Sequence, residues 1–266
     1  MTTIVFLAIL VGIVIVLIIA KIIIVINTKT PQKTQELVDE ISIGNVQSIC
    51  NADFQTNYFA TISKNNAVLS VVADGLNDNE SGRLASVIAV ETLKQNFNQS
   101  LNKAFSIKDF FKESFIEMQK TFSKNINLNK FGVKLAAVII DGGFLDYAIV
   151  GDCKIFVYRH KSKTLIDLLA AIESKNTNNC NNIIGTIKLM SKDIVMLASR
   201  AACENLTEME IAWYLELDNH PQEKCQMLLK RAQKKHVQQG NTTIIVLENL
   251  PAAAQTPQTH KTLLRE

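Results

Sequence analysis

The sequence predicts an α+β fold in which antiparallel sheets are covered by helices, preceded by one transmembrane helix. Short apolar segments rich in β-branched residues are joined by tight turns, as in hairpins, and strand–helix–strand alternation is absent. The predicted elements follow the order strands, two helices, strands, two helices and a final strand. A chain of 266 residues is long enough for a membrane anchor and one domain with its own core.

The apolar N-terminus predicts the transmembrane helix. In Ile4–Ile26 only Gly12 and Lys21 interrupt the apolar sequence, and about 20 such residues span a bilayer as a helix. A cleaved signal peptide, the alternative, needs a basic segment before a shorter apolar core. Lys21, Lys29 and Lys33 all lie towards the C-terminal side of the span, and the positive-inside rule then places the remaining chain in the cytoplasm. We therefore expect a single-pass membrane protein with a cytoplasmic C-terminal domain.

Composition divides the chain into four parts. Residues 1–27 form the predicted anchor, and residues 28–39, which contain Pro31, form a juxtamembrane linker. Residues 40–249 form the folded domain, and Glu36–Ile43 leads into it as a helix or as a first strand. Residues 250–266 are polar and are predicted to be a disordered tail.

Charge and cysteine content argue against two classes of site. The net charge of +3 is spread along the chain, so nothing favours a nucleic-acid partner. The five cysteines are an odd number and have no zinc-ligand spacing, which argues against a structural zinc site. Free, mostly buried thiols in a reducing compartment agree with the cytoplasmic location.

The stretch Val71–Ser86 organises the domain, because a buried strand ends there in Asp74-Gly75 and a helix follows. A carboxylate beside a glycine carbonyl offers oxygen ligands to a hard cation. The alternative is an aspartate that only caps a turn. Tyr58–Ser63 and Ala67–Ala73 read as a hairpin, which brings Asp53 and Asp74 to one end of a sheet. The two aspartates either share a site there or are unrelated turn residues.

Helical periodicity follows the turn. Apolar residues recur at helical spacing from Glu80 to Phe97, and a second helix is predicted from Phe105 to Ser123 with a phenylalanine stripe facing the core. Thr207 and Glu210 form a capping box that opens a later helix. The remaining predicted strands are 134–140, 144–150, 154–159, 183–188, 194–199 and 242–248, and the remaining helical segments are 165–173, 207–217 and 221–238.

Five segments follow one another between about residues 40 and 249: NAD at 51–53, VADGLNDNESGRLAS, FGVKLAAVIIDGGFLDYAIVGDCKIFVYR, DIVMLASRAACENLTEMEI and QGNTTIIVLE. Their succession resembles the PPM family of metal-dependent serine/threonine phosphatases, the protein phosphatase 2C (PP2C) type. The corresponding family patterns are, in the same order, N-E-D or N-Q-D; V-A-D-G-M-G-G-H, then A-G-x-x-A-S; the G-T-T-L strand, hairpin and G-D-S-R strand; D-x-L-L-L-x-S-D-G-L-x-D; and D-N-V-T. The resemblance implies a β-sandwich flanked by helix pairs, with a two-metal site between the sheets.

Carried over residue by residue, the resemblance implies metal ligands at Asp53, Asp74 and the Gly75 carbonyl, with Asp152 serving an additional ion. Other motif positions depart from the family pattern. Arg200 occupies the aspartate position of S-D-G and Gly240 that of D-N. The departures also include Ser48, or Gln47 with a shift of one residue, at the phosphate-binding arginine, Asn77-Asp78 at the double glycine, and Gly132-Val133-Lys134 at G-T-T.

These departures predict a pseudophosphatase, in which the fold is kept and catalysis is lost. Hard cations need several anionic oxygens, and Arg200 puts a positive charge where a ligand is expected. We hypothesise that Arg200 neutralises Asp53 and Asp74, and we expect no cofactor. The chain then serves as a membrane-anchored cytoplasmic binding or regulatory module for a protein partner such as a phosphoprotein or a kinase.

Two alternatives stay open at this point. One is an active Mn- or Mg-dependent serine/threonine phosphatase with a reduced ligand set, in which acids such as Asp193 or Glu204 compensate for the lost ligands. The other is a structural membrane subunit for which the former site has no role.

Overall fold

The computed structural model describes residues 40–50, 52–100, 106–124, 132–173, 183–235 and 240–250. All of them belong to one compact unit, residues 39–252. The predicted anchor, linker and most of the predicted tail lie outside the described residues. Within the described part of the chain, no helix is long and apolar enough to cross a membrane.

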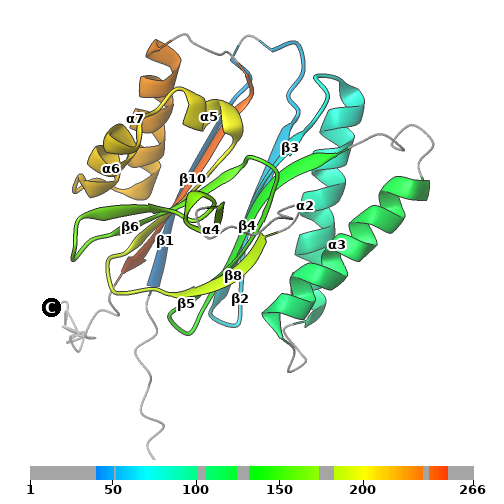
Figure 1. Ribbon diagram of the computed structural model, residues 1–266, viewed down its shortest axis with the longest axis horizontal. Helices are drawn as coiled ribbons and strands as arrows, with labels where there is room; N and C mark the ends of the chain where they lie inside the picture. The colour runs from blue at the N-terminus through cyan, green and yellow to red at the C-terminus, as the bar shows by residue number, and fades with distance from the viewer. Residues whose placement is uncertain are drawn as a thin grey trace, which may run out of the picture. The chain divides into compact units, whose positions relative to one another are not determined.

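Ten described strands form two antiparallel sheets of five strands each (Figure 1). One sheet has the order β1-β10-β9-β6-β7, with β1 Glu40–Ser48, β6 Lys154–Arg159, β7 Thr164–Asp167, β9 Ile194–Ala198 and β10 Thr242–Leu250. The other has the order β2-β3-β4-β5-β8, with β2 Asn57–Lys64, β3 Ala67–Gly75, β4 Val133–Asp141, β5 Phe144–Val150 and β8 Ile183–Lys188.

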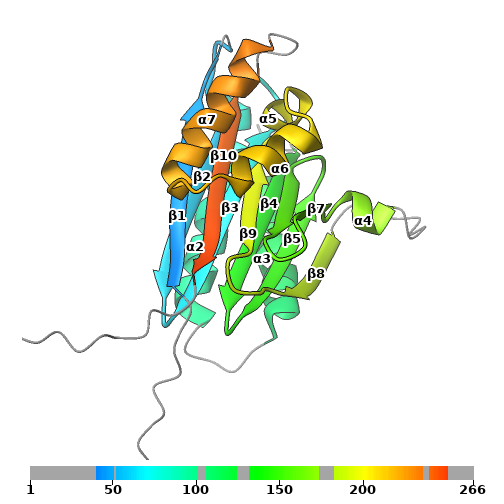
Figure 2. The ribbon, with the colours of Figure 1, turned by 90° about the vertical axis from the view of Figure 1, so that its left-hand side faces the viewer.

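Helices cover the outer face of each sheet (Figures 1 and 2). The helices α2 (Glu80–Ser100) and α3 (Ile107–Lys124) lie on the β2–β8 sheet. The helices α5 (Arg200–Glu204), α6 (Glu208–Glu216) and α7 (Pro221–Lys234) lie on the β1–β7 sheet. A short helix α4 (Ala170–Glu173) follows β7. The predicted α+β sandwich with flanking helices is therefore confirmed.

Alternation along the central strands builds three apolar layers. In β3, Val72 faces the other sheet, whereas Val71 and Ala73 pack against α2 and α3. In β10, Ile245 faces the opposite sheet and Ile244 packs under α5–α7. Because both faces of these strands are covered, they read as continuous apolar runs rather than as alternating ones.

Most predicted elements agree with the observed ones, and one differs in type. The helix predicted at 165–173 is instead strand β7 and the one-turn α4. The backbone of Thr164–Asp167 pairs with β6, and Asp167 Oδ1 accepts the N–H groups of Leu169 and Ala170, so tertiary pairing outweighs local helix propensity. Of the two readings of Glu36–Ile43, the strand is observed from Glu40 onwards. The phenylalanine stripe of α3 is buried, as predicted, at Phe110, Phe111 and Phe115.

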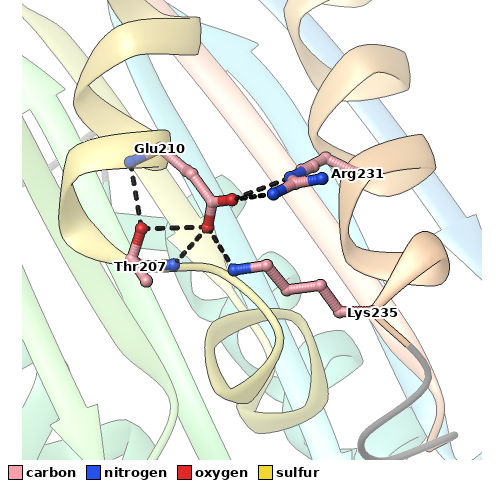
Figure 3. Close-up of polar contacts among 4 residues, drawn as sticks. All are labelled: Thr207, Glu210, Arg231 and Lys235. Atoms are coloured by element: carbon pink, nitrogen blue, oxygen red, sulfur yellow. Dashed lines mark hydrogen bonds and ion pairs between the residues drawn. The ribbon is translucent and has the colours of Figure 1, made fainter.

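Glu210 ties α6 to α7 (Figure 3). Its side chain accepts the Thr207 backbone N–H at 2.8 Å, and Thr207 Oγ1 accepts the Glu210 N–H at 3.3 Å, which confirms the predicted capping box. The same carboxylate contacts Arg231 Nη2 and Lys235 Nζ, each at 2.6 Å. The Lys235 hydrogen bond, followed by that of the Thr207 backbone, holds the pKa of Glu210 well below its ordinary value of 4.5.

We expect Glu210→Gln to lower the free energy of unfolding by about 1 kcal/mol near neutral pH, because it removes two ion pairs but keeps the capping oxygen. The folded-state pKa is depressed, so the difference from wild type is full above about pH 4.5 and disappears as the pH falls. Urea denaturation at several pH values measures it. Glu208→Gln, on the same helical turn but exposed, is the matched control and changes stability by less than about 0.5 kcal/mol. Equal effects of the two substitutions would contradict the assignment.

Candidate functional site

The candidate residues gather at the end of the sandwich where β1 and β3 end and β4 and β10 begin. The register pairs Asp74 with Asn57 on one side and with Lys134 on the other. Asp74 and Lys134 continue the row of the Val72–Ala136 pair, which belongs to the apolar layer between the sheets. Side chains opposite each other on neighbouring strands share one face, so Asp74 and Lys134 both point towards the second sheet.

A buried polar network joins the two sheets beneath this end. Asn57 Nδ2 donates to the Asn241 carbonyl at 2.8 Å, and Asn241 Nδ2 donates to Thr56 Oγ1 at 2.8 Å. Thr56 Oγ1 in turn lies 3.4 Å from Asp74 Oδ1. Ser199 Oγ donates to the Asn241 carbonyl at 3.2 Å. All of these side chains except Asp74 are nearly fully buried, so the network fixes the position of Asp74 relative to β9 and β10.

Gly75 has a packing role. A Cβ atom at this position would lie 2.1 Å from the Gly82 carbonyl oxygen, so only glycine lets the turn approach the start of α2. Asn79 caps that helix, because its Oδ1 accepts the backbone N–H groups of Ser81 and Gly82. The turn and the helix are therefore locked together directly after Asp74.

Asp74 is a partly buried carboxyl group. Burial raises its pKa from 3.8 to about 6, although Lys134 and the Thr56 hydrogen bond oppose the change. The charge of Asp152 adds to the increase. Asp74, at the end of β3, and Asp152, in the turn between β5 and β6, therefore lie close enough to interact electrostatically.

Two cations hold Asp152. Lys134 Nζ lies 3.0 Å and Arg200 Nη1 lies 3.4 Å from the same oxygen, Asp152 Oδ2. Arg200 also pairs with Glu204, which is the main cause of its raised pKa, and Asp152 and Asp74 add smaller contributions. Arg200 therefore reaches Asp152 by direct contact and Asp74 only through its field.

The other predicted site residues do not take part in the ion pairs of Asp152. Asp53 is exposed in the loop before β2 and forms no hydrogen bond or ion pair with a described residue. Ser48 Oγ accepts the Cys50 N–H at 3.2 Å and Gln47 Nε2 donates to the Asn57 carbonyl at 2.9 Å, so both are used in local structure. At Gly240, a Cβ atom would lie 3.2 Å from the Ala201 Cβ.

Neither acid named as a compensating ligand is free for that role. Asp193 is 1% exposed, pairs with Arg159 and accepts the Met190 N–H at 2.8 Å. It lies just before β9, whereas the site adjoins the other end of that strand at Ala198. Glu204 is held by Arg200.

Lys134 is a departure from the G-T-T pattern in the sequence, but that pattern predicts no role for its side chain. In the structure Val68 pairs with Ile140, and Lys134 therefore lies opposite Asp74. Pairing the predicted strands 67–73 and 134–140 end to end would place Lys134 opposite Ala73 instead, so the sequence pattern alone does not find this pair. A lysine directly across from an aspartate is a cross-strand ion-pair position.

The described donors do not fit the two-metal site that the resemblance implies. Two dications need several anionic oxygens, yet no three His, Cys, Asp or Glu side chains of the described residues are placed to hold a metal ion. Asp152 already binds two protein cations. A unit positive charge about 4 Å from an ion repels each unit of ionic charge by roughly 4 kcal/mol at an effective dielectric constant near 20.

We expect Asp74→Asn to raise the free energy of unfolding by about 1 to 3 kcal/mol near pH 8, because it removes a charge that burial disfavours. The folded-state pKa is raised, so wild-type stability from this group is full below pH 3.8 and is lost as the pH rises through about 6. The gain should vanish in acid, as measured by denaturant unfolding across pH. Asp141→Asn, at an exposed hairpin position, is the control. A loss of stability in Asp74→Asn near pH 8 would contradict this account.

Solved structures of bacterial phosphatases share the fold. A serine/threonine phosphatase of S. agalactiae matches with a TM-score of 0.65 and 18% identity over 78% of this chain and 99% of that one. The catalytic domain of the phosphatase PstP, in complex with two manganese ions, matches with a TM-score of 0.66 and 13% identity over 79% and 98% of the two chains. PppA of Pseudomonas aeruginosa matches with a TM-score of 0.63 and 15% identity over 79% and 98%.

Sequence comparison agrees with the fold. No curated protein sequence matches the chain significantly. The sequence profile of the family described as protein phosphatase 2C matches residues 46–194, which is more than half of the chain and includes the strands that carry Asp74 and Lys134. The chain therefore belongs to the protein phosphatase 2C family.

Proposed function

We propose that this chain is a pseudophosphatase, a PP2C-type domain that does not hydrolyse phosphoesters and acts as a membrane-tethered binding or regulatory module. One observation carries the proposal: Lys134 and Arg200 both contact Asp152 Oδ2, at 3.0 and 3.4 Å. Protein cations thus neutralise a carboxylate that the family resemblance assigns to metal binding.

The chemistry of phosphoester hydrolysis gives this observation its weight. The reaction needs dications to activate a water molecule and to balance phosphoryl charge, and the related PstP domain was solved with two manganese ions. An ammonium or guanidinium group can balance charge, but neither acidifies a bound water as a divalent metal does. A site neutralised by Lys134 and Arg200 therefore favours binding over hydrolysis.

The alternative, an active Mn- or Mg-dependent serine/threonine phosphatase, is favoured by the presence of Asp53, Asp74 and Asp152. It requires these three carboxylates to converge on metal ions. In the described structure Asp152 is paired with Lys134 and Arg200. The alternative therefore needs the release of Asp152 from its cations.

A protein partner fits this proposal better than a small substrate. PP2C-type phosphatases act on phosphoproteins, and the structural neighbour PppA is described as a key regulatory component of the T6SS of Pseudomonas aeruginosa. We propose a phosphoprotein or a kinase as the partner of this chain.

Enzymatic assay tests the lack of catalysis. Full-length protein in detergent should give no Mn-dependent release of phosphate from a phosphothreonine peptide and no hydrolysis of p-nitrophenyl phosphate. The physical reason is that Lys134 and Arg200 place two positive charges at Asp152, within electrostatic reach of Asp74, and disfavour dications there. Metal-dependent turnover that Asp74→Ala abolishes would overturn the proposal in favour of the active enzyme.

Cell fractionation tests the anchor. The full chain should sediment with membranes and resist alkaline carbonate, because the predicted apolar span inserts into the bilayer. A variant that lacks residues 1–27 should remain in the supernatant. Release of the full chain by carbonate would show that the span does not anchor it.

A further inference from the structure

Lys134 is a largely buried cation that lies between the two carboxylates of the site. Its side chain is 19% exposed and its Nζ donates to Asp152 Oδ2 at 3.0 Å. On the neighbouring strand it faces Asp74 in the register, and its charge acts on that carboxyl group. One ammonium group therefore serves both carboxylates, which come from β3 and from the turn between β5 and β6.

The glycine at position 151 leaves space for the Lys134 side chain. Gly151 has a φ of +72°, and a Cβ atom there would lie 3.0 Å from Lys134 Cγ. Glycine at this position thus allows the turn conformation and leaves room for the lysine stem to lie across the turn. The Lys134 ammonium group is directed to Asp152, the residue after Gly151, rather than to solvent.

Two protein cations offset most of the acidic charge in this cluster, in which three carboxylates face two cations. Asp74 and Asp152 lie with Lys134 and Arg200, and Glu204 forms a further pair with Arg200. Asp152 Oδ2 receives both cations, whereas its Oδ1 is buried and has no hydrogen-bond partner among the described residues. The cluster thus keeps a free carboxylate oxygen but little net negative charge with which to attract a dication.

We propose that Lys134 is a built-in counter-ion, which takes over the charge-balancing role of a divalent cation and thereby excludes such an ion from Asp74 and Asp152. This inference rests on the proposed loss of catalysis and assigns that loss to a specific side chain. It differs from the expectation drawn from the family motifs, which placed the replacing cation at Arg200 alone. Its consequence is that a single substitution should uncover a latent cation site.

Manganese binding to variants of the full chain in detergent tests this assignment. Mn²⁺ alone is the probe, and the readouts are the change in Tm and the amount of bound Mn²⁺ by electron paramagnetic resonance. We expect Lys134→Thr to gain an Mn²⁺-dependent rise in Tm of about 3 to 5 °C once Mn²⁺ exceeds its Kd tenfold. Wild type should change by less than about 1 °C, and Arg200→Asp combined with Lys134→Thr should bind more tightly than Lys134→Thr alone.

Two matched variants separate charge from packing. Lys134→Arg keeps the cation and should not respond to Mn²⁺. Lys154→Thr removes another strand lysine, which pairs with Asp167 at 2.7 Å, and should not respond either. Lys134→Gln is the second test variant in case Lys134→Thr does not unfold cooperatively, because glutamine removes the charge at similar length.

The outcomes are decisive in both directions. A response limited to variants that lack the Lys134 charge supports the inference. A response in wild type or Lys134→Arg equal to that in Lys134→Thr overturns it, as does no response in either neutral variant or a response of Arg200→Asp alone. Failure of the proposed function has a different signature, namely Mn-dependent turnover by wild type.

Discussion

The charge balance among Asp74, Asp152, Lys134 and Arg200 is the interaction on which the rest of this site depends. Two carboxylates that approach each other at the end of a sandwich repel, and the repulsion must be offset by cations or by protonation. Here the cations are side chains, at 3.0 and 3.4 Å from one carboxylate oxygen. Burial, with a smaller contribution from the Asp152 charge, still raises the pKa of Asp74 to about 6. In the folded protein, side chains supply the positive charge that offsets the two carboxylates. A metal site would instead have to bind cations from solution.

The buried polar network explains why this end of the sandwich is rigid. Asn241 accepts and donates bonds that reach Asn57, Thr56 and Ser199, so it joins β10 to the start of β2 and to the end of β9. Buried amide and hydroxyl groups are costly unless they are hydrogen-bonded. The network therefore specifies the relative position of the two sheets. The charged cluster lies next to this hydrogen-bonded end of the sandwich.

Much of this arrangement could be predicted from the sequence, because local signals decide it. Hairpin turns, the Thr207–Glu210 capping box and apolar periodicity identified nearly every strand and helix of the domain. The segment that forms β7 was read as helix, because its strand character comes from pairing with β6 and not from its own residues. The role of Lys134 was missed for a similar reason. Its partners, Asp74 and Asp152, are 60 and 18 residues distant in the chain, and only strand register brings the three together.

The motif positions that kept their residue type and those that changed differ in what they contact. Ser199 and Asn241, the retained members of the S-D-G and D-N patterns, are 0% and 5% exposed and bond to each other through the Asn241 carbonyl. Their neighbours Arg200 and Gly240 stand where the family pattern has aspartates. Loss of a buried hydrogen-bonded residue destabilises the fold, whereas replacing a partly exposed metal ligand removes only the metal. Under the proposed function, the ligands are lost while the sandwich is kept, and Lys134 and Arg200 supply positive charge beside Asp74 and Asp152.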